Sequence, residues 1–125
     1  MLSRNKKNLG NEGEKRAVEF LIANNYSILK TNFRVGRIGE IDIIAKDAEY
    51  ICFIEVKTRK SYSYGIPCEA VTIHKQEKIK LIAAIYISNT GSINKCVRFD
   101  VVEILMESNN NINKIKNINL IKNAF

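Results

Sequence analysis

The sequence predicts a single α/β domain with a mixed central sheet flanked by helices, in the order α-β-β-β-α-β(-β). Three observations support this prediction. The chain has 125 residues, which suits one domain. Its composition, 46% hydrophobic and 26% charged, is ordinary for a globular protein. Its apolar residues change between helical and strand periodicity along the chain, without an internal repeat or an interior linker.

The first helix is expected to follow a loose basic arm. Residues 1–10 are interpreted as this N-terminal arm, and residues 11–125 as the α/β domain. Asn11 is a suitable helix cap because Glu14 follows three residues later, in capping-box spacing. The helix should end near residues 24–25. Its apolar stripe consists of Ala17, Phe20 and Leu21.

The strands are expected where apolar residues alternate or run together. The predicted strands cover residues 26–33, 40–46, 50–57 and 96–105, with a short edge strand over 115–121. Asp47, Ala48 and Glu49 separate the second strand from the third, so these two strands should form a hairpin. Thr72 is a plausible cap for a second helix that ends at about Ile87. The apolar stripe of that helix consists of Ile79, Ile82, Ala83 and Tyr86.

The cysteines and the apolar segments exclude several classes of protein. Cys52, Cys68 and Cys96 lie far apart and His74 is the one histidine, so a structural zinc site or a disulfide framework is not expected. We expect Cys52 and Cys96 to be buried. No segment is long and apolar enough for a membrane span or a secretory signal, so we expect a cytoplasmic protein with no membrane partner.

The net charge of +7 is distributed unevenly. Residues 1–37 carry eight Lys or Arg against three Glu, whereas residues 38–106 carry nine residues of each sign. A basic surface on a small protein indicates a polyanionic partner such as nucleic acid. A merely soluble surface explains the same charge equally well.

Charged residues interrupt the predicted hairpin where its strands are most apolar. Asp42 lies between two isoleucines, and Glu55 and Lys57 flank a valine in the next strand. If Lys46 pairs with Ile51, Asp42 lies directly opposite Glu55. If the loop is two residues tighter, Asp42 faces Phe53 and Glu55 is diagonal to it. In both registers the three charges share one face of the sheet, whereas a slip of one residue would separate them.

Two neighbouring carboxylates are compatible with a divalent metal site. Without a cation they repel each other and raise each other's pKa. Mg²⁺ prefers oxygen ligands, which Asp42, Glu55 and the backbone carbonyl of Val56 can supply. Lys57 beside the metal could orient the attacking water or stabilise charge at phosphorus. The simpler alternative is an ion pair between Asp42 and Lys57 that protects an edge strand.

The sequence resembles the YraN family of small bacterial proteins, whose fold is similar to the Holliday junction resolvase-like branch of the PD-(D/E)XK nuclease superfamily. The resemblance implies a restriction-endonuclease-like fold. Ile41 stands where the superfamily's name places a proline. The matching stretches are "GNEGEKRAVEFL" (10–21), "GEIDII" (39–44), "FIEVKTR" (53–59), "AVTIHKQEKI" (70–79), "RFDVV" (98–102) and "NAF" (123–125).

The resemblance also implies roles for particular residues. The superfamily's metal-binding acids correspond to Asp42 and Glu55, and its catalytic lysine corresponds to Lys57. Two supporting active-site positions on the helices correspond to Glu14 and Gln76. Each position also has a simpler explanation. A glutamate such as Glu14 near the start of a helix is favoured by the helix dipole. Gln76 can be an ordinary polar residue on the surface.

Basic and aromatic residues around the hairpin are candidates for nucleic-acid contact. Such residues grip phosphates or stack on unpaired bases. A polar loop without a partner would have the same composition. Arm residues Arg4, Lys6 and Lys7 would add nonspecific phosphate affinity. The candidates are Arg34, Arg37, Arg59, Lys60, Tyr62, Tyr64 and Lys75.

These observations favour a metal-dependent endonuclease that hydrolyses phosphodiester bonds in structured or single-stranded DNA, with Mg²⁺ or Mn²⁺ as cofactor. A homodimer is expected if the protein cuts a symmetric junction at two places. One alternative is a nucleic-acid-binding module or accessory protein with the same fold that does not cut. Another is a protein-interaction role in which the charge serves only solubility.

Overall fold

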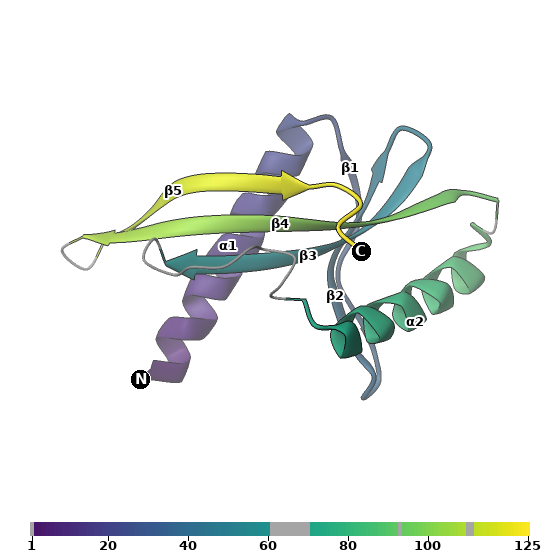
Figure 1. Cartoon of the computed structure of the whole chain (residues 1–125), viewed down its shortest axis with the longest axis horizontal. Helices are drawn as coiled ribbons and strands as arrows, with labels where there is room; N and C mark the ends of the chain where they lie inside the picture. Colours follow the sequence, from purple (N-terminus) through teal and green to yellow (C-terminus); the bar gives the residue numbers. More distant parts are fainter. Residues whose placement is uncertain (1, 61–70, 93, 110–111) are drawn as a thin grey trace.

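The computed structural model describes residues 2–60, 71–92, 94–109 and 112–125. The order of helices and strands is the predicted one, including the fifth strand (Figure 1). The elements are α1 (Leu2–Ala23), β1 (Ser27–Val35), β2 (Gly39–Asp47), β3 (Tyr50–Lys60), α2 (Ile73–Thr90), β4 (Cys96–Asn109) and β5 (Ile112–Ile121).

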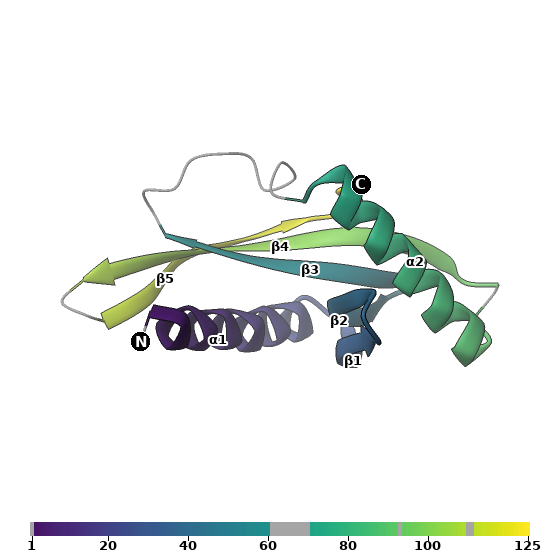
Figure 2. The same cartoon turned by 90° about the horizontal axis from the view of Figure 1, so that it is seen from below.

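The strands form one five-stranded mixed sheet in the order β1-β2-β3-β4-β5. The first three strands are an antiparallel meander. Strand β4 then pairs parallel to β3, with α2 in the connection, and β5 returns antiparallel to β4. Helix α1 lies along one side of the sheet and the start of α2 lies on the other side (Figure 2). The predicted α/β domain with a mixed sheet flanked by helices is therefore confirmed, and this arrangement is consistent with a nuclease-like fold.

Each helix covers one apolar face of the sheet, as the apolar stripes predict. The α1 face contains the buried residues Ala17, Leu21, Ile43, Cys52, Ile54 and Val102. The α2 face contains the buried residues Ile44, Phe53, Ile79, Ile82, Ala83 and Val101. Thr72 caps α2 by accepting a hydrogen bond from the amide of Lys75, and Gly91 ends the helix in the left-handed conformation.

Two expectations about local structure are wrong. Helix α1 begins at Leu2, so residues 2–10 are helical, and Asn11 lies inside the helix instead of capping it. Residues 2–10 contain Leu, Lys and Arg and no proline, so the helix extends through them at little cost in propensity. Cys96 is exposed because it is the first residue of β4. Cys52 is buried as expected.

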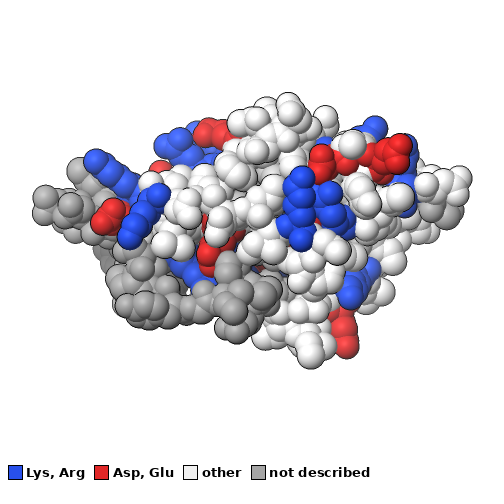
Figure 3. All heavy atoms as spheres, turned by 45° about the horizontal axis from the view of Figure 1, so that its top comes forward, with Lys and Arg blue, Asp and Glu red and all other residues white. Residues whose placement is uncertain are grey.

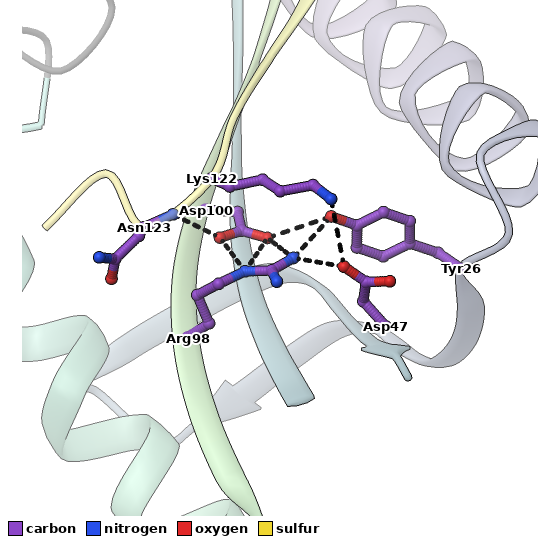
Figure 4. Close-up of polar contacts among 6 residues, drawn as sticks. All are labelled: Tyr26, Asp47, Arg98, Asp100, Lys122 and Asn123. Atoms are coloured by element: carbon purple, nitrogen blue, oxygen red, sulfur yellow. Dashed lines mark hydrogen bonds and ion pairs between the residues drawn. The ribbon is translucent and has the colours of Figure 1, made fainter. Parts of the chain in front are cut away.

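A buried polar network ties the start of β4 to the surrounding strands (Figure 4). Asp100 is 0% exposed and accepts hydrogen bonds from the guanidinium of Arg98 at 2.9–3.1 Å. Arg98 also donates to Asp47 at 2.9 Å and to the Tyr26 hydroxyl at 2.7 Å. The bond from Arg98 lowers the pKa of Asp47, whereas burial raises the pKa of Tyr26. The buried charge of Asp100 is thus compensated within the fold.

The same network holds the C-terminal residues against β4. The backbone amide of Asn123 donates to Asp100 Oδ1 at 2.9 Å, and the amide of Ala124 donates to the Phe99 carbonyl at 2.7 Å. The ring of Phe125 stacks on Phe99 with a centroid distance of 5.3 Å. The "RFDVV" and "NAF" stretches are therefore in contact, and these contacts hold the C-terminal residues in the fold.

Candidate functional site: a carboxylate–lysine cluster where β2 and β3 separate

The register of the β2–β3 hairpin places the two acids opposite each other. Lys46 pairs with Ile51 and Ile43 pairs with Ile54, which is the first of the two registers considered from the sequence. Continuing this register by one residue brings Asp42 opposite Glu55. The backbone ladder ends at that point, and β2 and β3 then run in different directions (Figure 1). Asp42 Oδ2 instead accepts a hydrogen bond from the Val56 amide at 2.9 Å.

Glu55 is the centre of the cluster. Its side chain is only 5% exposed, although it carries a carboxylate. The ammonium of Lys75, at the start of α2, lies 2.6 Å from Glu55 Oε1. The ammonium of Lys57 lies 3.9 Å from the same oxygen. Two cations therefore compensate one buried carboxylate, and the closer one comes from the helix, not from the strand.

Asp42 is held in an environment that disfavours its ionised form. Burial raises its pKa to about 7, and the negative charge of Glu55 adds to this effect. The hydrogen bond from the Val56 amide opposes the shift. Asp42 can therefore gain or lose a proton near neutral pH.

Glu14 joins the cluster from α1. Burial raises its pKa, followed by the charges of Glu40 and Glu55, while a hydrogen bond with Asp42 lowers it. The amide of Asn32 in β1 donates to Glu14 at 3.3 Å. Three carboxyl groups from α1, β2 and β3 thus face one another. We call Glu14, Asp42, Glu55, Lys57 and Lys75 the carboxylate–lysine cluster.

The two lysines of the cluster are shifted in opposite directions. Burial lowers the pKa of Lys57, and the positive charge of Lys75 lowers it further. Burial alone would also lower the pKa of Lys75, but the hydrogen bond and charge of Glu55 outweigh it and raise the pKa. Lys57 is therefore the better proton acceptor and Lys75 the better fixed cation.

Within the described residues, the side-chain contact of Gln76 is with Val71 and not with an acid of the cluster. Its side-chain amide donates to the Val71 carbonyl at 2.9 Å, within the segment that leads into α2. The ammonium of Lys75, which the sequence suggests as a nucleic-acid contact, forms an ion pair with Glu55. No contact of the Val56 carbonyl with the cluster stands among the described interactions. His74 is exposed, as expected.

The expected nucleic-acid contacts are only partly described. Arg34 and Arg37 are exposed near the β1–β2 turn, and Arg34 lies 3.8 Å from Glu40. Arg59 is largely buried and its guanidinium lies 3.2 Å from Glu103. Tyr62 and Tyr64 lie outside the described residues, as do the side chains of Lys60, Arg4, Lys6 and Lys7.

Sequence reasoning missed two polar residues near the cluster. Glu103 is 7% exposed and lies beside Lys57 in the parallel β3–β4 register. Asn32 adopts the left-handed conformation, which Asn tolerates, and binds Glu14. The signal for Glu103 was a charged residue between Val102 and Ile104, the same signal that pointed to Asp42. Nothing in the sequence around Asn32 marks it as a partner of Glu14.

The cluster is suited to a hard divalent cation. Asp42 and Glu55 supply carboxylate oxygens from neighbouring strands. Burial raises the pKa of Asp42 most, repulsion by Glu55 adds to it, and an added cation would relieve that repulsion. Within the described ranges, no three acidic, histidine or cysteine side chains form a ready-made ligand set. Asp42 and Glu55 would therefore share the ion with water or substrate oxygens, as Mg²⁺ commonly is.

The surface charge is mixed. On the face shown in Figure 3, the coloured Lys and Arg side chains occur in separate groups, with Asp and Glu close to most of them. The position of the cluster is therefore a better guide to a partner than the net charge is. In the part of the chain that the structure describes, no helix is long and apolar enough to cross a membrane.

Fold and site together define a small α/β protein with buried acids and lysines at the point where two central strands separate. The chain belongs to the uncharacterised protein family UPF0102, whose family model matches residues 13–104. This is the YraN family, so the resemblance noted from the sequence motifs is confirmed.

Relatives in other bacteria are similar over nearly the whole chain. A UPF0102 protein of Acetivibrio thermocellus is 54% identical, covering 97% of this chain and 93% of its own length. UPF0102 proteins of Caldicellulosiruptor saccharolyticus and Caldicellulosiruptor bescii are 50% and 52% identical, each covering 97% of this chain and 99% of its own length. These names state no activity, so the function has to be argued from the site.

Proposed function

We propose that this protein is a metal-dependent nuclease that hydrolyses phosphodiester bonds in structured or single-stranded DNA. The observation that supports the proposal is the meeting of Asp42, Glu55 and Lys57 where β2 and β3 separate, with Asp42 destabilised as an anion. An ion pair that protects an edge strand would not explain it, because β2 and β3 are both internal strands of the sheet.

Asp42 and Glu55 would hold Mg²⁺ or Mn²⁺. The metal would supply Lewis acidity toward the phosphate and lower the pKa of water. Lys57 has a lowered pKa and would position the attacking water or receive its proton. Glu14 would orient Asp42 through the hydrogen bond between the two side chains.

The test is a cleavage assay with the wild type, Glu55→Gln and Glu49→Gln. Glu49 is exposed in the hairpin turn, so its variant makes the same charge change away from the cluster. Labelled linear duplex, single-stranded, flap and four-way-junction DNA would be incubated with Mg²⁺ or Mn²⁺, or with EDTA. We expect metal-dependent cutting by the wild type and Glu49→Gln, and a loss of at least about 100-fold in Glu55→Gln.

Equal cutting by Glu55→Gln would assign the activity to a contaminant and contradict the proposal. No cutting by any of the proteins, with salt-sensitive DNA binding retained, would favour the non-cleaving binding module on the same fold. Symmetric cutting of the four-way junction would require two sites. In that case light scattering should give the mass of a dimer.

A further inference from the structure

Lys75 is paired with one carboxylate oxygen of Glu55, a residue that would hold the metal ion. Its ammonium is 2.6 Å from Glu55 Oε1, well within hydrogen-bond distance, whereas the Lys57 ammonium is at 3.9 Å. Glu55 is nearly buried, so it has little access to other compensating groups. A cation that binds Glu55 through Oε1 must therefore compete with Lys75.

The location of Lys75 is not explained by the stability of its helix. It lies in the first turn of α2, which contains no acidic residue. The helix macrodipole places partial positive charge at this end, so a lysine there is unfavourable for the helix. The backbone amide of Lys75 already serves the Thr72 cap, and that bond does not need a lysine side chain. Glu55 is thus the group that compensates the Lys75 ammonium.

The ammonium of Lys75 can also move away from Glu55 without a change in the fold. Its side chain is 42% exposed, whereas that of Lys57 on the sheet is 26% exposed. A lysine side chain has four rotatable bonds and a strongly hydrated ammonium, so a partly exposed one can turn into water. Lys57 is anchored on a central strand and has less room to do so.

We propose that Lys75 is a displaceable internal cation that neutralises Glu55 until a divalent metal replaces it. The inference rests on the proposed metal-dependent function. Lys75 keeps the buried carboxylate compensated in the metal-free protein and weakens metal binding, because the ion has to displace it. The released ammonium then lies at the edge of the site, where an incoming phosphate can pair with it.

The first test measures Mn²⁺ affinity by titration calorimetry in the wild type, Lys75→Met and Lys78→Met. Lys78 is exposed one turn further along α2, so its variant removes the same charge from the same helix. We expect Lys75→Met to bind Mn²⁺ about tenfold more tightly, which is the order of a charge-assisted hydrogen bond, and Lys78→Met to match the wild type. Lys75→Arg keeps the cation and should bind as weakly as the wild type. Lys75→Gln replaces Lys75→Met if the methionine variant does not fold.

The outcomes separate the two proposals. Equal Mn²⁺ affinity in the wild type and Lys75→Met, or weaker binding in Lys75→Met, overturns the role of Lys75 and leaves the metal site intact. No Mn²⁺ binding by any of the proteins overturns the metal-dependent function itself.

A second measurement distinguishes displacement from a general charge effect. The NMR signal of the Lys75 ε-carbon, assigned as the one absent from Lys75→Met, would be followed during titration with Mg²⁺. Release from Glu55 should shift and sharpen this signal, while the Lys78 signal stays constant. An unchanged Lys75 signal at Mg²⁺ saturation would show that the ammonium stays on Glu55 and would refute the inference.

Discussion

Replacing Asp42 by asparagine should stabilise the metal-free protein at high pH. The folded state raises the pKa of Asp42 from 3.8 to about 7, so it holds the carboxyl proton more tightly than the unfolded chain does. The ionised form at pH 8 therefore costs roughly 4 kcal/mol of stability. Asparagine has nearly the same shape, and its carbonyl can still accept from the Val56 amide.

The expected pH dependence follows from the direction of this shift. Below about pH 4 Asp42 is protonated in both states and imposes no cost, and stability is lost as the pH rises through about 7. Between pH 5 and pH 8 the cost grows by roughly 3 kcal/mol. Glu14, whose pKa is also raised, adjusts its own protonation and reduces this figure. We therefore expect the stability of Asp42→Asn relative to the wild type to grow by at least about 1 kcal/mol between pH 5 and pH 8.

The assay is urea unfolding in EDTA at pH 5 and pH 8, with Glu49→Gln as the control. This exposed variant should show the same small effect at both pH values. A gain for Asp42→Asn that is equal at the two pH values, or a loss at both, would refute the idea that the ionised carboxylate of Asp42 is destabilised by its surroundings.

Three further predictions concern the framework that holds the site. Asp100→Asn removes the buried charge that pairs with Arg98 and leaves Asp47 as its carboxylate partner, so urea unfolding should show a loss of about 3–5 kcal/mol. A loss below about 1 kcal/mol would contradict this prediction. Gly13→Ala places a methyl group against the Thr58 hydroxyl and should lower the free energy of unfolding by about 1–3 kcal/mol. Adding Thr58→Ala to the same chain should restore most of this loss. If the losses of the two single variants simply add in the double variant, the contact is refuted. Gly91→Ala should lower stability by about 1 kcal/mol because Gly91 has a φ of 70°, and an unchanged urea midpoint would argue against this.

The periodicity of the chain was enough to predict most of the architecture. Apolar residues two apart predicted the strands, and those three or four apart predicted both helices, because side-chain direction repeats with the geometry of each element. Hairpin contacts are equally local. The turn after β2 fixed which of the two registers forms, and this placed Asp42 opposite Glu55.

The start of α1 was not predictable in this way. The capping-box spacing of Asn11 and Glu14 is a local signal, but a cap competes with continuation of the helix. Residues 2–10 contain nothing that stops a helix, and α1 extends through them. The extent of an element thus depends on the segment as a whole and not on one favourable position.

The sequence by itself determined the strands, the two helices and the proximity of Asp42, Glu55 and Lys57 in one hairpin, since these follow from backbone geometry and short-range pairing. Only the tertiary structure decided that Lys75 and not Gln76 meets Glu55, and that Glu103 lies beside Lys57. Those contacts depend on how α2 packs on the sheet and on the parallel register of β3 and β4. Both depend on contacts between residues far apart in the sequence, which form as whole apolar faces are buried, and no single motif predicts them.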